Sequence, residues 1–367
     1  MEQDLIFACA LAITFESASG TARKLLDSYD SIRSLFEDKG ESPASRIKKQ
    51  KLEQLHSPQT MREAQGAVEW SLRNGIKPIY IYDDAYPARL RECCDAPLLL
   101  FVKGDMDLNP ARALAVVGTR AATQWGCRYC ENIISELGKS RPSPAIISGL
   151  AYGIDSYAHE SALKHGLRTI AVMGTGFETI YPPRNANLAA RILEQGAIIT
   201  EQVPFAPYYP KNFALRNRII AGMSDATLVV ESKEKGGSLI TANVAFGYSR
   251  EVFALPGKID DRTFAGCNNL IEKQVARIVT SAQSITSAMN WDTSTIRQQK
   301  IDFGDTGNIS ETGKLILNLL MEKPEIDIED ISIELKIRAS DLAQPLLELE
   351  LDGKISQISG NKYVING

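Results

Sequence analysis

Hydrophobic positions in the first 65 residues recur at intervals of three and four, the spacing of helices that bury one face. Three segments carry this pattern: "LIFACALAI" from Leu5, "SGTARKLLDSYDSIRSLFED" from Ser19 and "SRIKKQKLEQL" from Ser45. None of them alternates between apolar and polar residues as a half-buried strand would. We expect a small helical domain over residues 1–65, with Ser19 as the N-cap of its second helix.

From residue 66 onward, short apolar runs alternate with longer segments of helical spacing. Seven runs have the composition of buried strands: "KPIYIYD", "ALAVVGTR", "AIISGLA", "TIAVMGTG", "AIITEQ", "ATLVVES" and "EVFALPG". Near-continuous apolar strands that alternate with helices are typical of a parallel sheet covered on both faces. The pattern predicts an α/β fold over residues 66–285, with a Rossmann-like, doubly wound and mostly parallel sheet.

The pattern of apolar and polar residues changes again in the last part of the chain. Residues 286–308 are polar with little periodicity, and we interpret them as a linker. Three helical segments and two short strands follow over residues 309–367, with Gly360 and Asn361 at the tip of the final hairpin. This order resembles a winged helix-turn-helix domain, whose third helix normally enters the major groove of duplex DNA.

The third helix of this winged-helix-like domain has the wrong charge for duplex DNA. Its ionisable side chains are all acidic: Asp341, Glu348, Glu350 and Asp352. It also contains Pro345, so we expect the helix to start late or to be kinked. A protein contact or an architectural role is therefore favoured over duplex binding.

The length and charge of the chain limit the classes of function that it can have. The chain has 367 residues, enough for two or three domains, with 41 basic and 45 acidic side chains and a formal charge of −4. Any binding of nucleic acid must therefore come from a local basic patch. No apolar run approaches the ~20 residues that span a bilayer, and the start "MEQD" lacks the basic region of a secretory signal. We expect a cytoplasmic protein without membrane insertion.

Cysteine spacing gives no indication of a metal site. Cys127 and Cys130 form the only CxxC pair, and neither a second pair nor an HxxxH segment supplies further zinc ligands. We interpret both as small residues on a helix face and predict no bound metal.

Glycine-rich loops follow four of the predicted strands, at the edge where open parallel sheets bind ligands. Glycine lets an anion approach the backbone, and the next helix N-terminus adds partial positive charge. The loop residues are Gly118, Thr119 and Arg120; Ser148 and Gly149; Gly174, Thr175 and Gly176; and Gly236, Gly237 and Ser238. A tight turn explains any one loop, but their recurrence predicts an anion-binding rim. The chain has neither GxxxxGK[ST] nor a complete GxGxxG, so we expect no nucleotide cofactor.

Basic and aromatic residues are interleaved in one later stretch. Between Val203 and Met223 the chain has three basic residues and no acid. With the first glycine loop, the predicted exposed cations are Arg120, Lys211, Arg216 and Arg218. Several separated cations suit a polyanion, and the rings of Phe205, Tyr208, Tyr209 and Phe213 lie among them. Each base of a single strand gains about 1–3 kcal/mol by stacking on such a ring, although Phe213 fits a core position equally well.

A hydrolytic site is the competing interpretation. Four ionisable residues lie at or just after predicted strand ends: Asp155, His159, Glu201 and Glu231. A capping Asp155 followed by a surface His159 explains the first two more simply than catalysis. The chain has no GxSxG, no HExxH and no carboxylate pair with acid–base spacing, so we predict no catalytic residue.

Taken in order, these motifs resemble the DNA-processing protein A family, DprA or Smf. The matching segments are "DDAYPARL", "VVGTR", "SGLAYGID", "GTG" with "YPPRN", "RNRIIAGMSDATLVVES", "GGSLITA" and "VFALPG" with "GCNNLI". The three-part layout is similar to the family's sterile-alpha-motif-like N-domain, Rossmann-like core and winged-helix tail. The resemblance implies a homodimer without established catalytic activity. It also implies sequence-independent binding of single-stranded DNA and loading of the RecA recombinase during natural transformation.

By the family's motifs, the DNA pocket would be formed by two segments of this chain. They contribute Gly118, Thr119 and Arg120, and Lys211, Phe213, Arg216, Asn217 and Arg218. Two features depart from the family: Ala214 stands where proline is usual, and Lys211 lies closer to Phe213 than the typical lysine. The alternative function is a nucleotide-processing Rossmann enzyme similar to the lysine-decarboxylase-like phosphoribohydrolases, whose PGGxGTxxE run this chain lacks.

Overall fold

The structure, a computed structural model, divides into two compact units, residues 1–292 and 293–367, and each is described by itself. It describes residues 2–15, 19–38, 49–207, 209–291, 310–358 and 362–366. The side chain of Ser19, Tyr208, the predicted hairpin tip and residues 292–308 of the predicted linker lie outside the described part. The expected boundaries near residues 65, 285 and 308 stay predictions.

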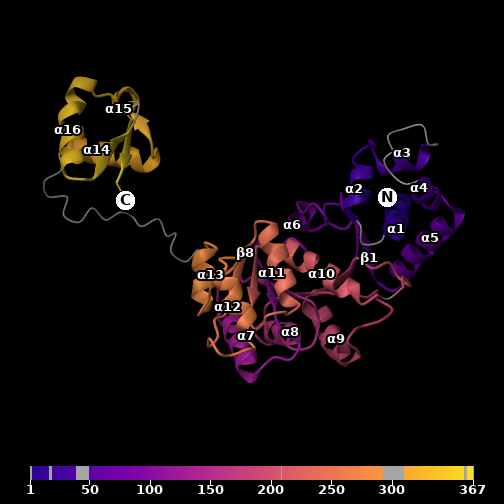
Figure 1. The fold of residues 1–367 in the computed structure, drawn as a ribbon. Coiled ribbons are helices and arrows are strands. Elements are labelled where there is room, and N and C mark those ends of the chain that lie inside the picture. Colours follow the sequence, from indigo (N-terminus) through magenta and orange to yellow (C-terminus); the bar gives the residue numbers. More distant parts are fainter. Residues whose placement is uncertain are drawn as a thin grey trace. The chain divides into compact units, whose positions relative to one another are not determined.

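The described part of the first unit begins with five helices (Figure 1). They are α1 (Glu2–Phe15), α2 (Ser19–Leu26), α3 (Ile32–Glu37), α4 (Lys49–Leu55) and α5 (Pro58–Arg73). Helix α5 starts sharply because the Ser57 side chain accepts from the backbone N–H of Thr60 and Pro58 occupies the first turn. Leu11 of α1 and Val68 of α5 are buried in one hydrophobic core with Leu99 of the sheet. The N-terminal helices therefore pack directly on the sheet.

The sheet runs in the order β1-β2-β6-β5-β4-β3-β7-β8-β9. Its strands are β1 (Lys77–Tyr80), β2 (Leu99–Gly104), β3 (Ala113–Val117), β4 (Ala145–Ser148), β5 (Thr169–Val172), β6 (Ala197–Thr200), β7 (Ala226–Val229), β8 (Glu251–Ala254) and β9 (Arg277–Ile278). From β6 to β9 all neighbours are parallel, whereas β2 is antiparallel to both β1 and β6. The predicted Rossmann-like, mostly parallel fold is confirmed, with β2 and β9 as unpredicted additions.

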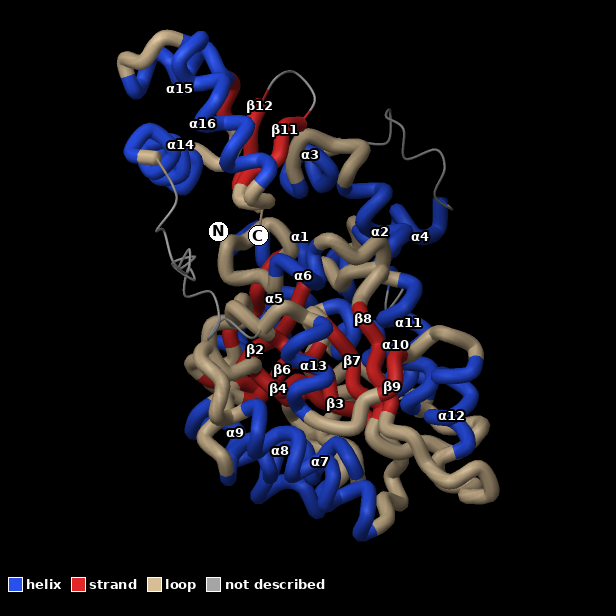
Figure 2. Tube along the Cα trace, turned by 90° about the vertical axis from the view of Figure 1, so that its left-hand side faces the viewer, coloured by secondary structure: helices blue, strands red, loops and turns tan. Residues whose placement is uncertain are grey.

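Helices cover both faces of the sheet, because its strands are apolar on both sides. Helices α7 (Gln124–Leu137), α8 (Ile154–Lys164) and α9 (Ala186–Gln195) lie on one side of the strands (Figure 2). Leu114 and Val116 of β3 pack in the core of α7 and α8. Ala113 and Ala115 point into the opposite core, which holds α10 (Lys211–Gly222), α11 (Ser238–Gly247) and α12 (Ala265–Glu272). The described part of this unit also contains helices α6 (Ala88–Arg91) and α13 (Ala282–Ala288) and the short η2 (Pro183–Asn185).

The second unit has its own hydrophobic core and a three-stranded sheet in the order β10-β12-β11. Its elements are α14 (Glu311–Glu322), β10 (Ile326–Asp327), α15 (Ile328–Leu335), α16 (Ala339–Leu351), β11 (Ile355–Ile358) and β12 (Lys362–Ile365). Strand β10 was not predicted. Pro345 lies inside α16, so of the two expected alternatives the late start is wrong, and the kink stays a prediction. The winged-helix assignment stays a prediction. Within the described ranges, neither unit has a helix that combines the length and apolar character needed to cross a bilayer.

Candidate nucleic-acid interface

The loops after β3, β4, β5 and β6 lie at one edge of the sheet, because these neighbouring strands are parallel. Arg120 follows β3, Gly149 follows β4 and Gly174 follows β5. The first turn of α10 approaches the same edge, since Phe213 lies against Gly174 and Arg216 against Gly149. The tertiary structure therefore joins the predicted glycine loops to the basic, aromatic stretch.

Arg120, Phe213 and Tyr181 form an exposed cluster at this edge, which we call the Arg120 cluster. The Arg120 guanidinium carbon lies 5.9 Å from the centroid of the Phe213 ring. The Tyr181 ring lies on Phe213 at 5.2 Å and 44°. Arg120 and Tyr181 are exposed, and Phe213 is half-buried. The cluster offers one cation beside two aromatic rings.

Gly174 permits the close approach of α10. A Cβ atom at this position would lie 2.7 Å from Cδ1 of Phe213 and 3.2 Å from its Cα. Any side chain there would push the ring and the helix backbone away. Tyr181 was not among the predicted site residues, although its segment "YPPRN" belongs to the matching motifs.

Arg216 is buried beneath the Arg120 cluster, with 3% of its surface exposed. Its Nη1 donates to the carbonyl oxygens of Gly149, at 2.6 Å, and of Val172. Burial lowers the pKa of Arg216 to about 10, and the opposite charge of Asp155 counteracts that fall. The interpretation of Arg216 as an exposed cation is wrong, because its guanidinium joins the ends of β4 and β5.

Arg218 is also buried and forms an ion pair with Glu201, with Nη2 2.5 Å from Oε2. Burial raises the pKa of Glu201, and the charge of Arg218 opposes that rise. Arg218 Nη1 and Glu201 Oε1 have no hydrogen-bond partner within the described ranges. The expectation that Arg218 is an exposed cation is therefore wrong too, because a carboxylate neutralises it inside the protein.

Lys211 keeps the exposure that the sequence predicts. Its Nζ lies 5.0 Å from the centroid of the Tyr209 ring. Asn217 is half-buried, and its Oδ1 accepts from Nε of Arg216 at 3.2 Å. Of the four predicted cations, only Arg120 and Lys211 remain exposed to solvent.

The other loop residues contact protein groups. Ser148 Oγ donates to the Val116 carbonyl at 2.7 Å, and Thr175 Oγ1 donates to the Thr179 carbonyl at 2.7 Å. Gly176 lies against the Glu178 carboxylate. These hydroxyls stabilise the loops, and their predicted phosphate contacts stay predictions.

The Gly236, Gly237 and Ser238 loop follows β7, on the other side of β3 from the Arg120 cluster. Ser238 Oγ donates to Ser232 Oγ at 2.8 Å, and Gly237 is exposed. The predicted phosphate contact of this loop stays a prediction as well.

Glu231 occupies the position at which Rossmann folds usually hold an anion. The strand order reverses between β3 and β7, and a pyrophosphate normally lies there at the next helix N-terminus. Glu231 is fully buried, and its Oε2 accepts from Thr123, the N-cap of α7, through the backbone N–H at 3.0 Å and Oγ1 at 2.9 Å. Its carbonyl accepts from the Thr119 N–H at 2.8 Å. A carboxylate of the protein therefore fills this anion position.

Asp155 and His159 differ from their predicted roles. Gly153, not Asp155, is the N-cap of α8, and His159 is fully buried. His159 Nδ1 is hydrogen-bonded to Thr169 Oγ1 at 2.7 Å. Burial and the charge of Arg216 lower the pKa of His159 to about 3, so this imidazole is neutral at neutral pH. The surface expectation is wrong because α8 packs between α7 and α9 as well as on the sheet.

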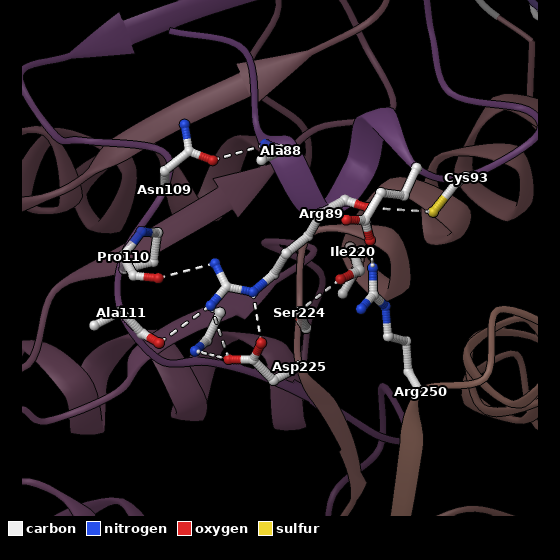
Figure 3. Close-up of polar contacts among 12 residues, drawn as sticks. Ala88, Arg89, Cys93, Asn109, Pro110, Ala111, Ile220, Ser224, Asp225 and Arg250 are labelled. Atoms are coloured by element: carbon white, nitrogen blue, oxygen red, sulfur yellow. Dashed lines mark hydrogen bonds and ion pairs between the residues drawn. The ribbon is translucent and has the colours of Figure 1, made fainter. Parts of the chain in front are cut away.

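A polar network surrounds Asp225, just after the C-terminal end of α10 (Figure 3). Arg89 Nε lies 2.6 Å from Asp225 Oδ1, and its Nη1 donates to the Pro110 carbonyl at 2.8 Å. Asp225 Oδ2 accepts from the Ala113 N–H at 2.7 Å. This network ties α6 to the starts of β3 and β7, the strand that follows α10.

The described residues contain no cluster of His, Cys, Asp and Glu side chains that could hold a metal ion. Cys130 is buried in α7 and Cys127 is half-buried. These positions agree with their interpretation as small residues on a helix face.

The chain is similar to known proteins over most of its length. The model of the family described as DNA recombination-mediator protein A matches residues 77–290. The DNA processing protein DprA of Streptococcus pneumoniae is 43% identical over 205 residues, which cover 56% of this chain and 71% of that protein. Protein Smf of Escherichia coli is 36% identical over 284 residues, 75% of this chain and 74% of that protein.

Two solved structures are also similar. DprA of Streptococcus pneumoniae has a TM-score of 0.57 and 33% identity, and the match covers 73% of this chain and 97% of that one. DprA of Helicobacter pylori, described for its single-stranded DNA binding mode, has a TM-score of 0.53 and 26% identity. That match covers 59% of this chain and 96% of the other.

Proposed function

This chain belongs to the DNA recombination-mediator protein A family, and on that premise we propose that it binds single-stranded DNA without sequence specificity. It loads the RecA recombinase onto the bound strand and acts as a homodimer in the cytoplasm, without catalysing a reaction itself. The similarity to DNA processing proteins and to a structure described for single-strand binding supports this function.

The Arg120 cluster is the observation that carries the proposal. A phosphate contacts the exposed guanidinium of Arg120, and the adjoining base stacks on Phe213 or Tyr181. Stacking contributes about 1–3 kcal/mol per base and is nearly independent of sequence, because every base has a π face. Lys211 provides a second exposed cation on the first turn of α10.

The buried arginines support this surface from below. Arg216 bonds to the loop after β4, and Arg218 holds α10 against the end of β6 through Glu201. Neither side chain reaches a phosphate in this conformation. Their role is to position Phe213.

Two other functions are disfavoured by specific side chains. A nucleotide-processing enzyme needs an open phosphate site, and the Glu231 carboxylate occupies the usual one at the N-terminus of α7. Release of free base from nucleoside monophosphates would revive that alternative. Duplex reading by α16 is opposed by its exposed acids, Asp341, Glu348, Glu350 and Asp352.

Fluorescence anisotropy of labelled oligonucleotides tests the proposal. The full chain is titrated with one strand and with the matching duplex at several salt concentrations. We expect preference for the single strand. We also expect Arg120→Ala to weaken binding to every sequence alike and to lower the salt slope by about 0.7. Arg191→Ala, which removes an exposed arginine on α9, is the matched control and leaves the affinity and the salt slope unchanged. Unchanged affinity after combined Arg120→Ala and Phe213→Ala substitution would contradict the site.

RecA loading and dimerisation need separate measurements. The rate at which RecA assembles on a labelled single strand is compared with and without this protein, and a faster rate is expected. Sedimentation gives the oligomeric state. A RecA assembly rate that this protein does not raise would remove the loading function while leaving DNA binding intact.

A further inference from the structure

A cavity of about 820 Å³ opens between α5 and the loop that follows β6. Trp70 of α5 and Phe205 and Tyr209 of the loop form its aromatic lining, and Asn212 of α10 lies at its edge. We call it the Trp70 pocket. None of these residues belongs to the Arg120 cluster.

Phe205 combines two features that a chain normally avoids. The residue is 64% exposed, although a phenylalanine ring gains stability by burial. Its φ of +66° lies in the left-handed region that L-residues rarely adopt. The ring lies 5.1 Å from that of Trp70, at 68°. Backbone outliers of this kind are concentrated at functional sites, where the surrounding fold maintains them.

The Trp70 pocket continues the edge on which the Arg120 cluster lies. Strands β3, β4, β5 and β6 are neighbours, so the loops after β3 and β6 are three strand spacings apart, about 14 Å. Tyr209 and Asn212 border the pocket, and Lys211 between them carries its cation over the Tyr209 ring. A strand that leaves Phe213 therefore passes Lys211 and reaches the pocket.

The charges of the wall favour a base over a phosphate. Glu69 pairs with Arg73 at 2.8 Å, and Glu201 pairs with the buried Arg218. The charged residues that line the pocket are Arg62, Glu63, Glu69, Arg73 and Glu201. Two cations against three carboxylates leave no net positive charge, so the wall offers little attraction to a phosphate. Its rings offer stacking surfaces to a neutral base.

We propose that the Trp70 pocket is a second subsite for single-stranded DNA and binds unstacked bases downstream of the Arg120 cluster. The inference rests on the proposed single-strand binding and extends its footprint onto the N-terminal helices. It assigns Trp70 and Phe205 to stacking and Lys211 to the phosphate between the two subsites.

Tryptophan fluorescence tests the proposal directly, because the chain has three tryptophans and one of them is Trp70. In full-length protein that carries Trp125→Phe and Trp291→Phe, the emission reports Trp70 alone. Oligothymidylates of about 4 and about 12 nucleotides are titrated, and binding is followed in parallel by anisotropy. The longer strand is expected to quench Trp70, whereas the shorter one binds the Arg120 cluster with little quenching.

The affinity of single variants, measured by anisotropy, gives a second readout that does not depend on tryptophan emission. Trp70→Ala is expected to weaken binding of the longer strand about 5- to 150-fold and to leave the shorter strand unchanged. Leu72→Ala is the matched control, since Leu72 is exposed on α5 and does not line the pocket. If the tryptophan variants fail to fold, photocrosslinking of bromodeoxyuridine strands to wild-type protein replaces them, with crosslinks expected at Trp70 or Phe205.

The outcomes separate this inference from the proposed function. Binding of the longer strand with unchanged Trp70 emission, equal affinity in Trp70→Ala, or crosslinks confined to Phe213 and Tyr181 would overturn the second subsite alone. Quenching of the Trp70 emission by added RecA but not by DNA would assign the pocket to a partner protein and would also overturn the second subsite. Absence of any binding in the anisotropy assay would remove the proposed function and the subsite together.

Discussion

Arg216 Nη1 donates to the carbonyl oxygen of Gly149 at 2.6 Å, and the missing side chain of Gly149 leaves room for that guanidinium. A Cβ atom at Gly149 would lie 2.6 Å from Arg216 Nη2 and 2.7 Å from Asp155 Oδ2. The loop after β4 and the middle of α10 are thus matched in shape as well as in hydrogen bonding. The position of Phe213 above them depends on this match.

Gly149→Ala is expected to destabilise the first unit by roughly 1–3 kcal/mol, because the new methyl group overpacks a site with no free volume. Urea unfolding measures the change. Gly237→Ala is the matched control: its Cβ would meet nothing within 4 Å, so its stability stays within about 0.5 kcal/mol. Equal stability of both variants would contradict the described packing.

Arg216→Ala and Arg120→Ala are expected to distinguish a residue that stabilises the fold from a residue that binds single-stranded DNA. The first removes the side-chain donor to the carbonyls of Gly149 and Val172 and the positive charge near the buried Asp155, so it lowers stability by roughly 3–5 kcal/mol. The second removes an exposed side chain and changes stability by less than about 0.5 kcal/mol, while it weakens single-strand binding. Unfolding free energy and anisotropy are measured on the same preparations. A stable Arg216→Ala protein would show that this guanidinium is not structural.

His159 is expected to make stability fall as pH drops below about 6.5. The unfolded imidazole binds a proton near its ordinary pKa, whereas burial holds the folded pKa at about 3. Between these values the unfolded state binds more protons, so the free energy of unfolding falls by about 1.4 kcal/mol per pH unit. His159→Asn keeps a polar side chain without this titration. Parallel pH profiles of the wild type and the variant would refute the buried, neutral assignment.

Pro345→Ala is expected to stabilise the second unit by roughly 1–3 kcal/mol. Proline in the interior of α16 leaves the Asp341 carbonyl without its helical donor, and such a residue costs up to about 3 kcal/mol. Calorimetry of the full chain follows the transition of this unit. Gln344→Ala, an exposed neighbour on the same helix, serves as control and shifts the transition little. A lower transition temperature in Pro345→Ala would show that the proline fits the helix without strain.

The local sequence pattern was sufficient to predict most of the fold. Strand composition, helical spacing and glycine loops each depend on only a few consecutive residues. The pattern placed seven of the nine described strands of the large sheet and the loops of Arg120, Gly149 and Gly174. It missed β2, whose run "LLFVKG" is apolar and continuous, a pattern that buried helices share. It also missed β9 and β10, which span two residues each and form only by pairing with a distant strand.

The sequence by itself determined the doubly wound sheet, the order of its loops and the identity of the family, since all three depend on local motifs and their succession. Only the tertiary structure decided which charges face solvent. Arg216 and Gly149 are 67 positions apart, so no local pattern reports that α10 buries this guanidinium. The same long-range packing buries His159 and brings Tyr181 onto Phe213. Exposure of a charged side chain is a property of the whole fold, because it depends on what distant segments pack against it.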